Sequence, residues 1–518
     1  PWRHARAAGW VATLMLVLFL GHATQRVVSV PWIDPPSPAA LMTGSKDPRT
    51  AQRFEAVYPP LKLIHRELTE SERTTYPPSG FGGHLQAMDL IRARAQMLVF
   101  SSEGDLAKDE ELLQWLRLNE PLLPRIESAT QAAGMVDFSS DGISATQSNL
   151  NWMLSRSPMG AKLMDLSLIL GLRARERLSA SDLAAAWRAI ATTRRLGRQV
   201  LQTPTIPAEY IGVLLLSRAN DVARVWALDR RQTAESLRAA EESWSELQPL
   251  PGFEFMILHE DRMIRDLLQF DRGGIASIMS AMNGPSRSSD RMSWALASLS
   301  NGFAASPWEC ARLERVLNWS TAWSLRLAAL PAFERPQAMP GSQGRGWGDL
   351  PSVSAANARF AGLPRIEQGP DLEALIHSTP AARYLLLNDR SFLARRDGEA
   401  VDSRVVGAMI RVRLHALEHG GAWPQSLKAA YGDAEPPIDP YSGRPLGYRI
   451  TARHELISVP ALPGGYGVVP PMRKVDVPAG TPVLWSIGPD LRDQGGHGEL
   501  PRSPGQLYDL IVPILLSR

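Results

Sequence analysis

The stretch MDLSLILGLRARERLSASDLA, residues 164–184, indicates the architecture of much of this 518-residue chain. A second stretch, MDLIRARAQMLVFSSEGDLA at residues 88–107, contains the same three elements in the same order: MDL, RAR and DLA. The MDL and DLA elements keep nearly the same spacing, whereas the RAR elements are offset by a few residues. We interpret the two stretches as a gapped repeat of one helical hairpin.

Helical periodicity supports this interpretation in the first copy. The apolar residues of one helical face are Leu85, Met88, Ile91, Ala95 and Leu98, and those of the helix after the SSEG turn are Leu106, Leu112, Leu113 and Leu116. Each hairpin exposes an apolar face that a neighbour must cover, so the sequence predicts a solenoid-like or bundle-like array over residues 81–330. The later helices of this mainly α chain are predicted over residues 207–226, 231–247, 253–270 and 311–329.

The first 30 residues carry a membrane signal. Arginines precede an uncharged run over residues 7–25, which predicts a cytoplasmic N-terminus. An uncleaved single-pass anchor is favoured because Trp10 and Trp32 suit the two interfaces. A cleaved signal peptide with small residues at 21–23 is the alternative, and both place the bulk of the chain on the extracytoplasmic side. The proline-rich residues 31–80 predict a stiff stalk.

Composition narrows the functional classes. The formal net charge is only +3 and no dense Lys/Arg run occurs, so a nucleic-acid partner is not expected. Cys310 is the only cysteine, which excludes an intramolecular disulfide and a cysteine-rich zinc site. Its expected role is that of a small buried hydrophobic side chain.

The densest polar cluster of the helical region is His259, Glu260 and Asp261. Adjacent residues on a helix point about 100° apart, so this cluster predicts a solvated helix face. No HExxH, G-x-S-x-G or phosphate-binding loop motif occurs. The sequence therefore predicts no catalytic residues and no enzyme. The alternative is an envelope hydrolase with a site between helices, for which His259 and Glu260 are the candidates.

A linker over residues 331–370, rich in glycine and proline, separates the array from a C-terminal region over 371–518. A helix is predicted over 399–419, ended by Gly420-Gly421. Its apolar stripe consists of Val405, Met409, Val412 and Ala416.

Three motifs follow this helix in a fixed order. The first comprises Gly421, Trp423, Pro424 and Leu427; the second comprises Asp439, Pro440, Tyr441, Gly443, Pro445, Leu446 and Tyr448; the third comprises Ser486, Gly488, Asp490, Gly495, Gly496 and Asp509. This order resembles the C-terminal part of type II secretion major pseudopilins and of large helical bacterial membrane-anchored proteins that carry the same tail. The resemblance covers residues 399–512 and implies a small pilin-like α+β module. Leu14 stands where a prepilin-peptidase site has glutamate.

In that family the closing loop binds calcium, which takes oxygen ligands. The resemblance implies Asp490, Asp493, Glu499 and Asp509 as the metal ligands. Leu491 replaces a glycine of the family, and an insertion separates Glu499 from Asp509. A loop that keeps its shape without an ion is therefore the equal alternative.

Together these features predict a protein of the bacterial inner membrane with one N-terminal helix, whose bulk serves as an extracytoplasmic interaction or scaffold module. A connection with a type II secretion or pilus-like system rests on the resemblance. An atypical pseudopilin is the third alternative, beside the hydrolase.

Overall fold

The computed structural model describes residues 61–67, 87–100, 106–131, 158–203, 205–248, 252–270, 306–335, 372–379, 389–460, 472–488 and 510–516, together with scattered positions outside these ranges. The chain divides into two compact units that are not continuous in sequence. The first unit combines Pro1–Ser45, Gly142–Ser155 and Phe253–Arg390, and the second combines Lys46–Asp141, Arg156–Gly252 and Ser391–Arg518. The described chain is mainly helical, as predicted.

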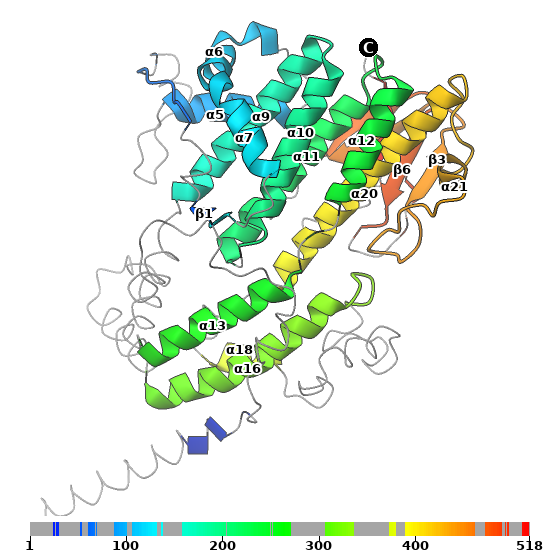
Figure 1. Cartoon of the computed structure of the whole chain (residues 1–518). Helices are drawn as coiled ribbons and strands as arrows, with labels where there is room; N and C mark the ends of the chain where they lie inside the picture. Colours follow the sequence, from blue (N-terminus) through cyan, green and yellow to red (C-terminus); the bar gives the residue numbers. More distant parts are fainter. Residues whose placement is uncertain are drawn as a thin grey trace, which may run out of the picture. The chain divides into compact units, whose positions relative to one another are not determined.

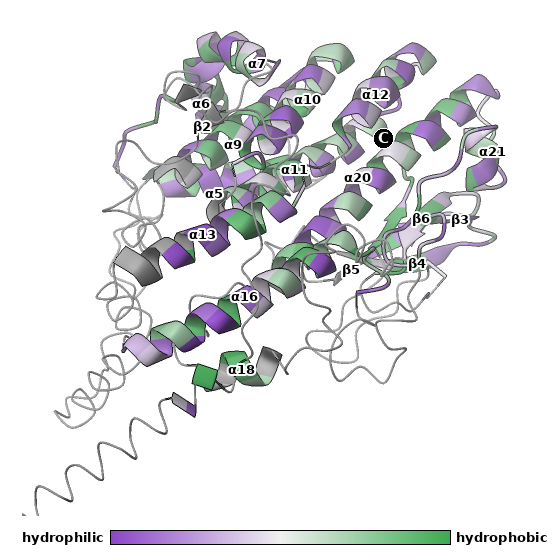
Figure 2. Cartoon of the chain, turned by 60° about the horizontal axis from the view of Figure 1, so that its bottom comes forward, coloured by the Kyte–Doolittle hydropathy of each residue, from purple (hydrophilic) through white to green (hydrophobic). Residues whose placement is uncertain are grey.

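Helices form most of the second unit. They are α5 (Ala87–Phe100), α6 (Glu110–Asn119), α7 (Leu123–Gln131), α9 (Pro158–Ser179), α10 (Leu183–Val200), α11 (Ile206–Ala227), α12 (Ala234–Leu247), α20 (Asp389–Glu418) and α21 (Leu427–Tyr431), with short 3-10 turns η2 (Leu106–Lys108) and η3 (Glu120–Leu122). Helices α9, α10 and α11 lie side by side (Figure 1). Hydrophilic and hydrophobic residues are both present along each of these three helices (Figure 2), and the hydrophobic ones supply the core.

Local capping explains where the second hairpin turns. Helix α9 ends at Ser179, and the Asp182 side chain accepts a hydrogen bond of 3.0 Å from the amide of Ala185 at the start of α10. A side-chain oxygen at this position satisfies one of the amides that the first helical turn leaves without a partner. The stretch 164–184 is therefore a helix, a turn and a capped helix start, as the sequence predicts.

One hydrophobic core joins the helices of the second unit. The predicted apolar residues Met88, Ile91, Ala95 and Leu98 belong to it, which confirms the predicted face of α5. Three of the tryptophans in this core pack together. Trp187 of α10 lies 4.4 Å from Trp226 of α11 and 5.6 Å from Trp244 of α12, measured between ring centroids.

Helix α20 belongs to this helical core. Its predicted stripe is buried, with Val405, Met409 and Val412 each at 0% exposure. Val406, Ile410 and Leu414 form a second buried stripe and join the core of α9–α12. Helix α20, which the sequence assigns to the C-terminal region, thus also packs into the core of the helical array, because it is apolar on two sides. Most of it belongs to the second compact unit, together with the array and the C-terminal strands.

The C-terminal strands form two small sheets. β3 (Gly447–Ile450), β6 (Pro482–Ser486) and β7 (Leu510–Pro513) form an antiparallel sheet in the order β3-β6-β7. β4 (Glu455–Pro460) and β5 (Met472–Val477) form an antiparallel pair. A shared apolar cluster of Ile457, Val459, Val477, Val483 and Ile511 joins the two sheets. A further parallel pair links β1 (Gln52–Arg53) and β2 (Val136–Asp137).

Part of the predicted stalk packs onto the helical array. The carbonyl of Lys62 accepts hydrogen bonds from Trp115 Nε1 at 3.1 Å and Asn119 Nδ2 at 3.0 Å, both on α6. Leu61 and Ile64 pack against the main core. Residues 61–67 therefore lie on the array, since they supply apolar side chains and a backbone partner for two buried polar groups of α6.

The first unit contains α13 (Glu254–Phe270), α16 (Pro307–Ala329) and α18 (Leu372–Ser378). The described residues include no helix both long and apolar enough to span a membrane. Most of the predicted anchor over residues 1–30, most of the rest of the stalk and most of the 331–370 linker lie outside the described residues.

Candidate functional site

Asp439 connects the second and third motifs of the C-terminal region. Its side chain is 1% exposed. Oδ1 accepts hydrogen bonds from Ser486 Oγ at 2.8 Å and from the Tyr441 amide at 3.1 Å, and Oδ2 accepts one from the Ile487 amide at 3.1 Å. One buried carboxylate therefore fixes the DPYSG turn to the end of β6, where the predicted metal loop begins.

The first motif is attached through Tyr448. Its hydroxyl donates a hydrogen bond of 2.7 Å to the carbonyl of Pro424. Burial raises the pKa of the Tyr448 hydroxyl, which keeps it a neutral donor over the physiological pH range. All three motifs thus meet around β3 and β6, although they lie far apart in the sequence.

Trp485 organises the start of the closing loop. A Cβ added at Gly447 would lie 2.0 Å from Trp485 Cε2, and one added at Gly496 would lie 2.7 Å from Trp485 Cε3. The indole is therefore in close contact with glycine backbone from β3 and from the loop. Gly496 also has φ of +68°, a conformation that favours glycine.

Asp493 is the one predicted metal ligand that the structure describes. Its Oδ1 accepts hydrogen bonds from Trp485 Nε1 at 3.0 Å and from the Gly495 amide at 2.8 Å. Asp490, Glu499 and Asp509 lie outside the described residues. The part of the chain that is described contains no group of three or more metal-ligating side chains. Asp493 therefore supports the loop through these two hydrogen bonds.

We expect Gly447→Ala to destabilise the protein by about 1–3 kcal/mol, because the new methyl group overlaps the Trp485 ring. The urea midpoint measures this effect, provided the slope of the transition is unchanged. Gly398→Ala in α20 is the matched control, since its Cβ meets no atom within 4 Å. That control is expected to gain about 0.5–1 kcal/mol. Equal midpoints for the Gly447 variant and the native protein would show that Trp485 is free to move away.

A second polar cluster lies inside the helical unit. Arg194 of α10 is fully buried and donates to Glu399 Oε1 at 3.0 Å, Asn220 Oδ1 at 2.8 Å and Ser403 Oγ at 2.6 Å. Its guanidinium also lies 4.3 Å from the ring centroid of Trp244. Burial raises the pKa of the Glu399 carboxyl and lowers the pKa of the Arg194 guanidinium. Arg194 thus joins α10 to α11 through Asn220 and to α20 through Glu399 and Ser403.

Asp221 lies in the neighbouring part of this cluster. Arg224 donates to Asp221 Oδ1 at 3.0 Å and to Asp402 Oδ1 at 2.7 Å. Burial raises the pKa of Asp221 to about 7; Asp402 acts in the same direction, whereas Arg224 opposes the shift. A carboxyl with such a pKa suits proton transfer, but catalysis also requires access for a substrate.

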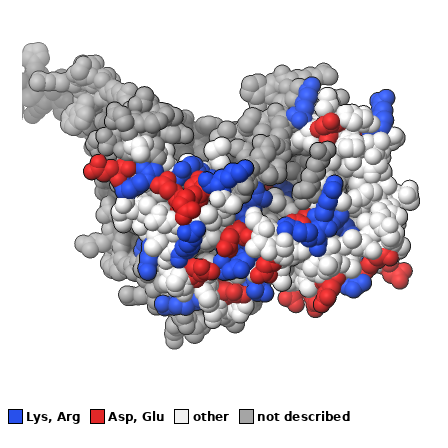
Figure 3. Space-filling model, turned by 90° about the horizontal axis from the view of Figure 1, so that it is seen from above, with Lys and Arg blue, Asp and Glu red and all other residues white. Residues whose placement is uncertain are grey.

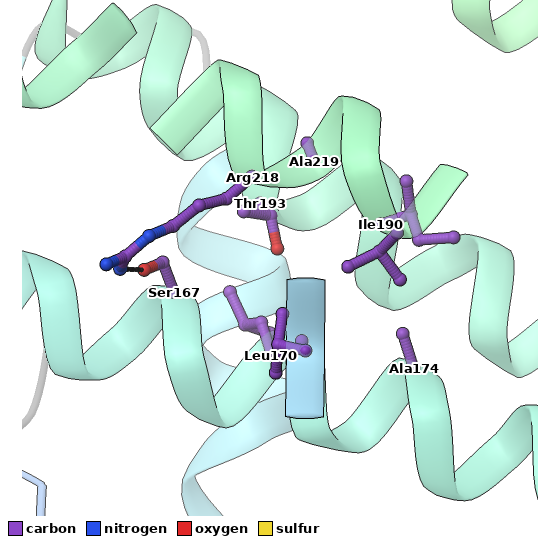
Figure 4. Close-up of a pocket in the computed structure, with 10 residues that line it drawn as sticks. Ser167, Leu170, Ala174, Ile190, Thr193, Arg218 and Ala219 are labelled. Carbon is purple, nitrogen blue, oxygen red and sulfur yellow. Dashed lines mark hydrogen bonds between the residues drawn. The ribbon is translucent and has the colours of Figure 1, made fainter. Parts of the chain in front are cut away.

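A cavity close to this cluster offers little access. It measures about 10 Å³, which is room for about one water molecule. Ser167 accepts a hydrogen bond from Arg218 at its edge, and the Thr193 hydroxyl faces the cavity between apolar side chains such as Leu170 and Ile190 (Figure 4). The cavity is thus a small packing defect between α5, α9, α10 and α11.

The structure corrects the prediction of a solvated face at 259–261. His259 is exposed, but Glu260 and Asp261 are only 1% and 6% exposed. Asp261 accepts hydrogen bonds from Arg265 on its own helix and from Thr321 of α16 at 2.6 Å. For Asp261 the prediction was wrong because Arg265 and Thr321 supply polar partners that allow its carboxylate to be buried.

Cys310 lies on the same helix α16. It is 5% exposed and forms no disulfide, which confirms its predicted role as a small buried side chain.

Acidic and basic side chains are interspersed on the face drawn in Figure 3, without a large area of one sign.

Comparison with protein-family models, with curated proteins and with solved structures finds no match for this chain.

Proposed function

We propose that this protein is a membrane-anchored extracytoplasmic scaffold that presents its C-terminal sheets to another protein of the cell envelope. The observation that supports this most is the position of α20. It belongs at once to the helical core and to the support of the C-terminal strands. A scaffold needs such a rigid connection between its body and the surface that it presents.

The contacts of α20 with the helical array are numerous and buried. Arg396 forms an ion pair with Glu209 of α11, with Nε and Oε1 2.5 Å apart, and Arg224 pairs with Asp402. Trp244 Nε1 donates to the carbonyl of Ser403 at 2.9 Å. These contacts fix the helix along its first half.

Other residues of α20 contact the C-terminal region. Arg404 Nη1 donates to the carbonyl of Ile438 at 2.5 Å, and Arg411 Nε donates to the carbonyl of Ala430 at 2.8 Å. The carboxylates of the buried cluster bind arginines across the core, which favours a scaffold over a hydrolase.

Fractionation of bacterial cells tests the proposal. We expect the protein to remain in carbonate-washed membranes, and we expect protease added to spheroplasts to digest the part after residue 30. Recovery in the cytosolic fraction, or complete protection in spheroplasts, would contradict it. Processing next to Gly9 by a prepilin peptidase would instead support the pseudopilin alternative.

We also propose that the closing loop binds calcium through Asp490, Asp493, Glu499 and Asp509. The melting temperature is then expected to rise with Ca²⁺ relative to chelator, since a ligand that binds only the folded state stabilises it. Asp490→Ala should abolish the rise. Asp493→Ala is a poor probe because Asp493 also accepts hydrogen bonds from Trp485 and Gly495.

The control for the calcium measurement is Asp433→Ala, which removes an exposed carboxylate from another part of the same region. This variant should keep the full calcium-dependent rise. No rise in the native protein would leave the ion-free loop as the correct alternative.

A further inference from the structure

A short segment at the end of the predicted anchor region is described, and its last residue is buried. Thr24, Gln25, Val27 and Val28 are helical, and the amide of Val30 donates a hydrogen bond of 3.3 Å to the carbonyl of Val27. Val28 is 59% exposed, whereas Val30 is 0% exposed. The helical segment therefore ends in a turn that buries Val30.

Helix α16 contacts this turn. Arg315 Nη1 donates a hydrogen bond of 2.8 Å to the carbonyl of Val30. The last carbonyls of a helix have no partner within the helix, and the helix dipole favours a cation beside them. Val30 and α16 belong to the same compact unit, so the bond is internal to that unit. It fixes the end of the anchor region to a helix that lies 285 positions later in the chain.

The face of α16 that carries Arg315 also carries three tryptophans. Trp308 precedes Arg315 by about two turns, and Trp319 and Trp323 follow within the next turns of the helix. Trp319 is buried, whereas Trp308 and Trp323 are half-buried and keep part of their rings accessible. Tryptophan is enriched where a protein meets the interface of a membrane with water, because its ring is apolar and its N–H is polar.

We propose that helix α16 lies at the lipid head groups of the membrane, a position that rests on the proposed N-terminal anchor. The uncharged run ends at Gln25 and Arg26 follows it. A helical rise of about 1.5 Å per residue places Val30 about 8 Å beyond Gln25. The polar layer on each side of the hydrocarbon core is about 5–8 Å thick. Val30 and its partner Arg315 therefore lie at the level of the head groups.

This attachment changes the role of the proline-rich stretch. Residues 31–80 follow Val30 in the chain, so they come after the point that is fixed to α16. A spacer located there does not separate α16 from the bilayer. The charges beside Arg315 are mixed, since Glu314 Oε1 lies 4.0 Å from Arg265 Nη1. Contact with neutral phospholipid is therefore expected, without a need for anionic lipid.

Quenching of a fluorophore on α16 by spin-labelled lipid head groups tests the proposal. The full chain carries Glu314→Cys in a Cys310→Ala background, so that one label is attached, and is reconstituted into phosphatidylcholine vesicles. The Glu314 side chain is 41% exposed, which leaves room for the label. We expect the label to be quenched. Arg315→Ala should largely abolish the quenching, since loss of a hydrogen bond from a charged donor shifts the attachment equilibrium by about tenfold or more.

The matched control is Arg335→Ala. Arg335 also donates to a backbone carbonyl of the same unit, that of Leu327 at 2.9 Å, but does not contact Val30 through this bond. This control should leave the quenching unchanged. Val30→Lys opposes Arg315 with a like charge and changes no residue of α16, so it should reduce the quenching while circular dichroism shows the helices retained.

Two results would overturn the position of α16: no quenching in the native chain, or undiminished quenching in both folded variants, Arg315→Ala and Val30→Lys. Carbonate washing of the same vesicles separates this failure from failure of the anchor. A chain that washes off lacks the anchor of the proposed function. A chain that is retained without quenching has an anchor, but its α16 does not lie at the head groups.

Discussion

Arg194→Met is expected to lower the free energy of unfolding by about 3–5 kcal/mol, the largest single effect that we predict. The substitution leaves the Glu399 carboxylate in the core without its cationic partner, because both side chains are fully buried. It also removes the donors to Asn220 and Ser403. Denaturant unfolding followed by far-ultraviolet circular dichroism measures the loss.

A second substitution separates the cost of an isolated charge from the value of the ion pair. Arg194→Met combined with Glu399→Leu should recover much of the lost stability, since the core then contains no unpaired carboxylate. Arg238→Met is the surface control, as its partner Glu418 is partly exposed and the pair is expected to contribute less than about 1 kcal/mol. Equal losses for Arg194→Met and Arg238→Met would contradict the role of burial.

Asp439→Ala is expected to cost about 2–4 kcal/mol and to loosen the C-terminal sheets before the helices. The alanine side chain offers no acceptor to the Ser486 hydroxyl or to the amides of Tyr441 and Ile487. A buried donor that loses its acceptor costs about 1–3 kcal/mol. Hydrogen exchange followed by mass spectrometry should show faster exchange in β6 than in α10 or α11.

The control for Asp439 is Asp433→Ala, an exposed aspartate six residues earlier, which should change stability by less than about 0.5 kcal/mol. If Asp439→Ala leaves exchange in β6 unchanged, the carboxylate does not hold the turn to the strand. Uniform loss of protection across the chain would mean that the sheets and helices unfold as one unit.

Much of the helical architecture was predictable from local sequence. The helices predicted over 207–226, 231–247 and 253–270 correspond closely to α11, α12 and α13. Their periodicity and caps are properties of neighbouring residues, which a single sequence displays directly. The buried stripe of α20 was predictable for the same reason.

The buried charges were not predictable in this way. From its sequence, Glu399 is expected to face solvent, but it is buried. Its partner Arg194 lies 205 positions earlier in the chain, so the sequence does not show the pairing. Glu260 and Asp261 were expected at the surface because adjacent residues of a helix point in different directions, and the sequence does not show that Thr321, 60 positions later, donates to Asp261. One indication of buried charges was present in the sequence of α11, where the run SRANDVAR at 217–224 places polar residues on several sides of an otherwise apolar helix.

The sequence by itself determined the elements of this protein: the helices, their caps, the order of the three C-terminal motifs and the buried character of Cys310. These depend on the spacing and chemistry of residues close together in the chain. Only the tertiary structure decided that α20 is shared between the helical core and the C-terminal strands. It also decided that residues 61–67 pack on α6. Such choices depend on which distant surfaces bury an apolar face or satisfy a buried polar group, and local spacing does not encode that pairing.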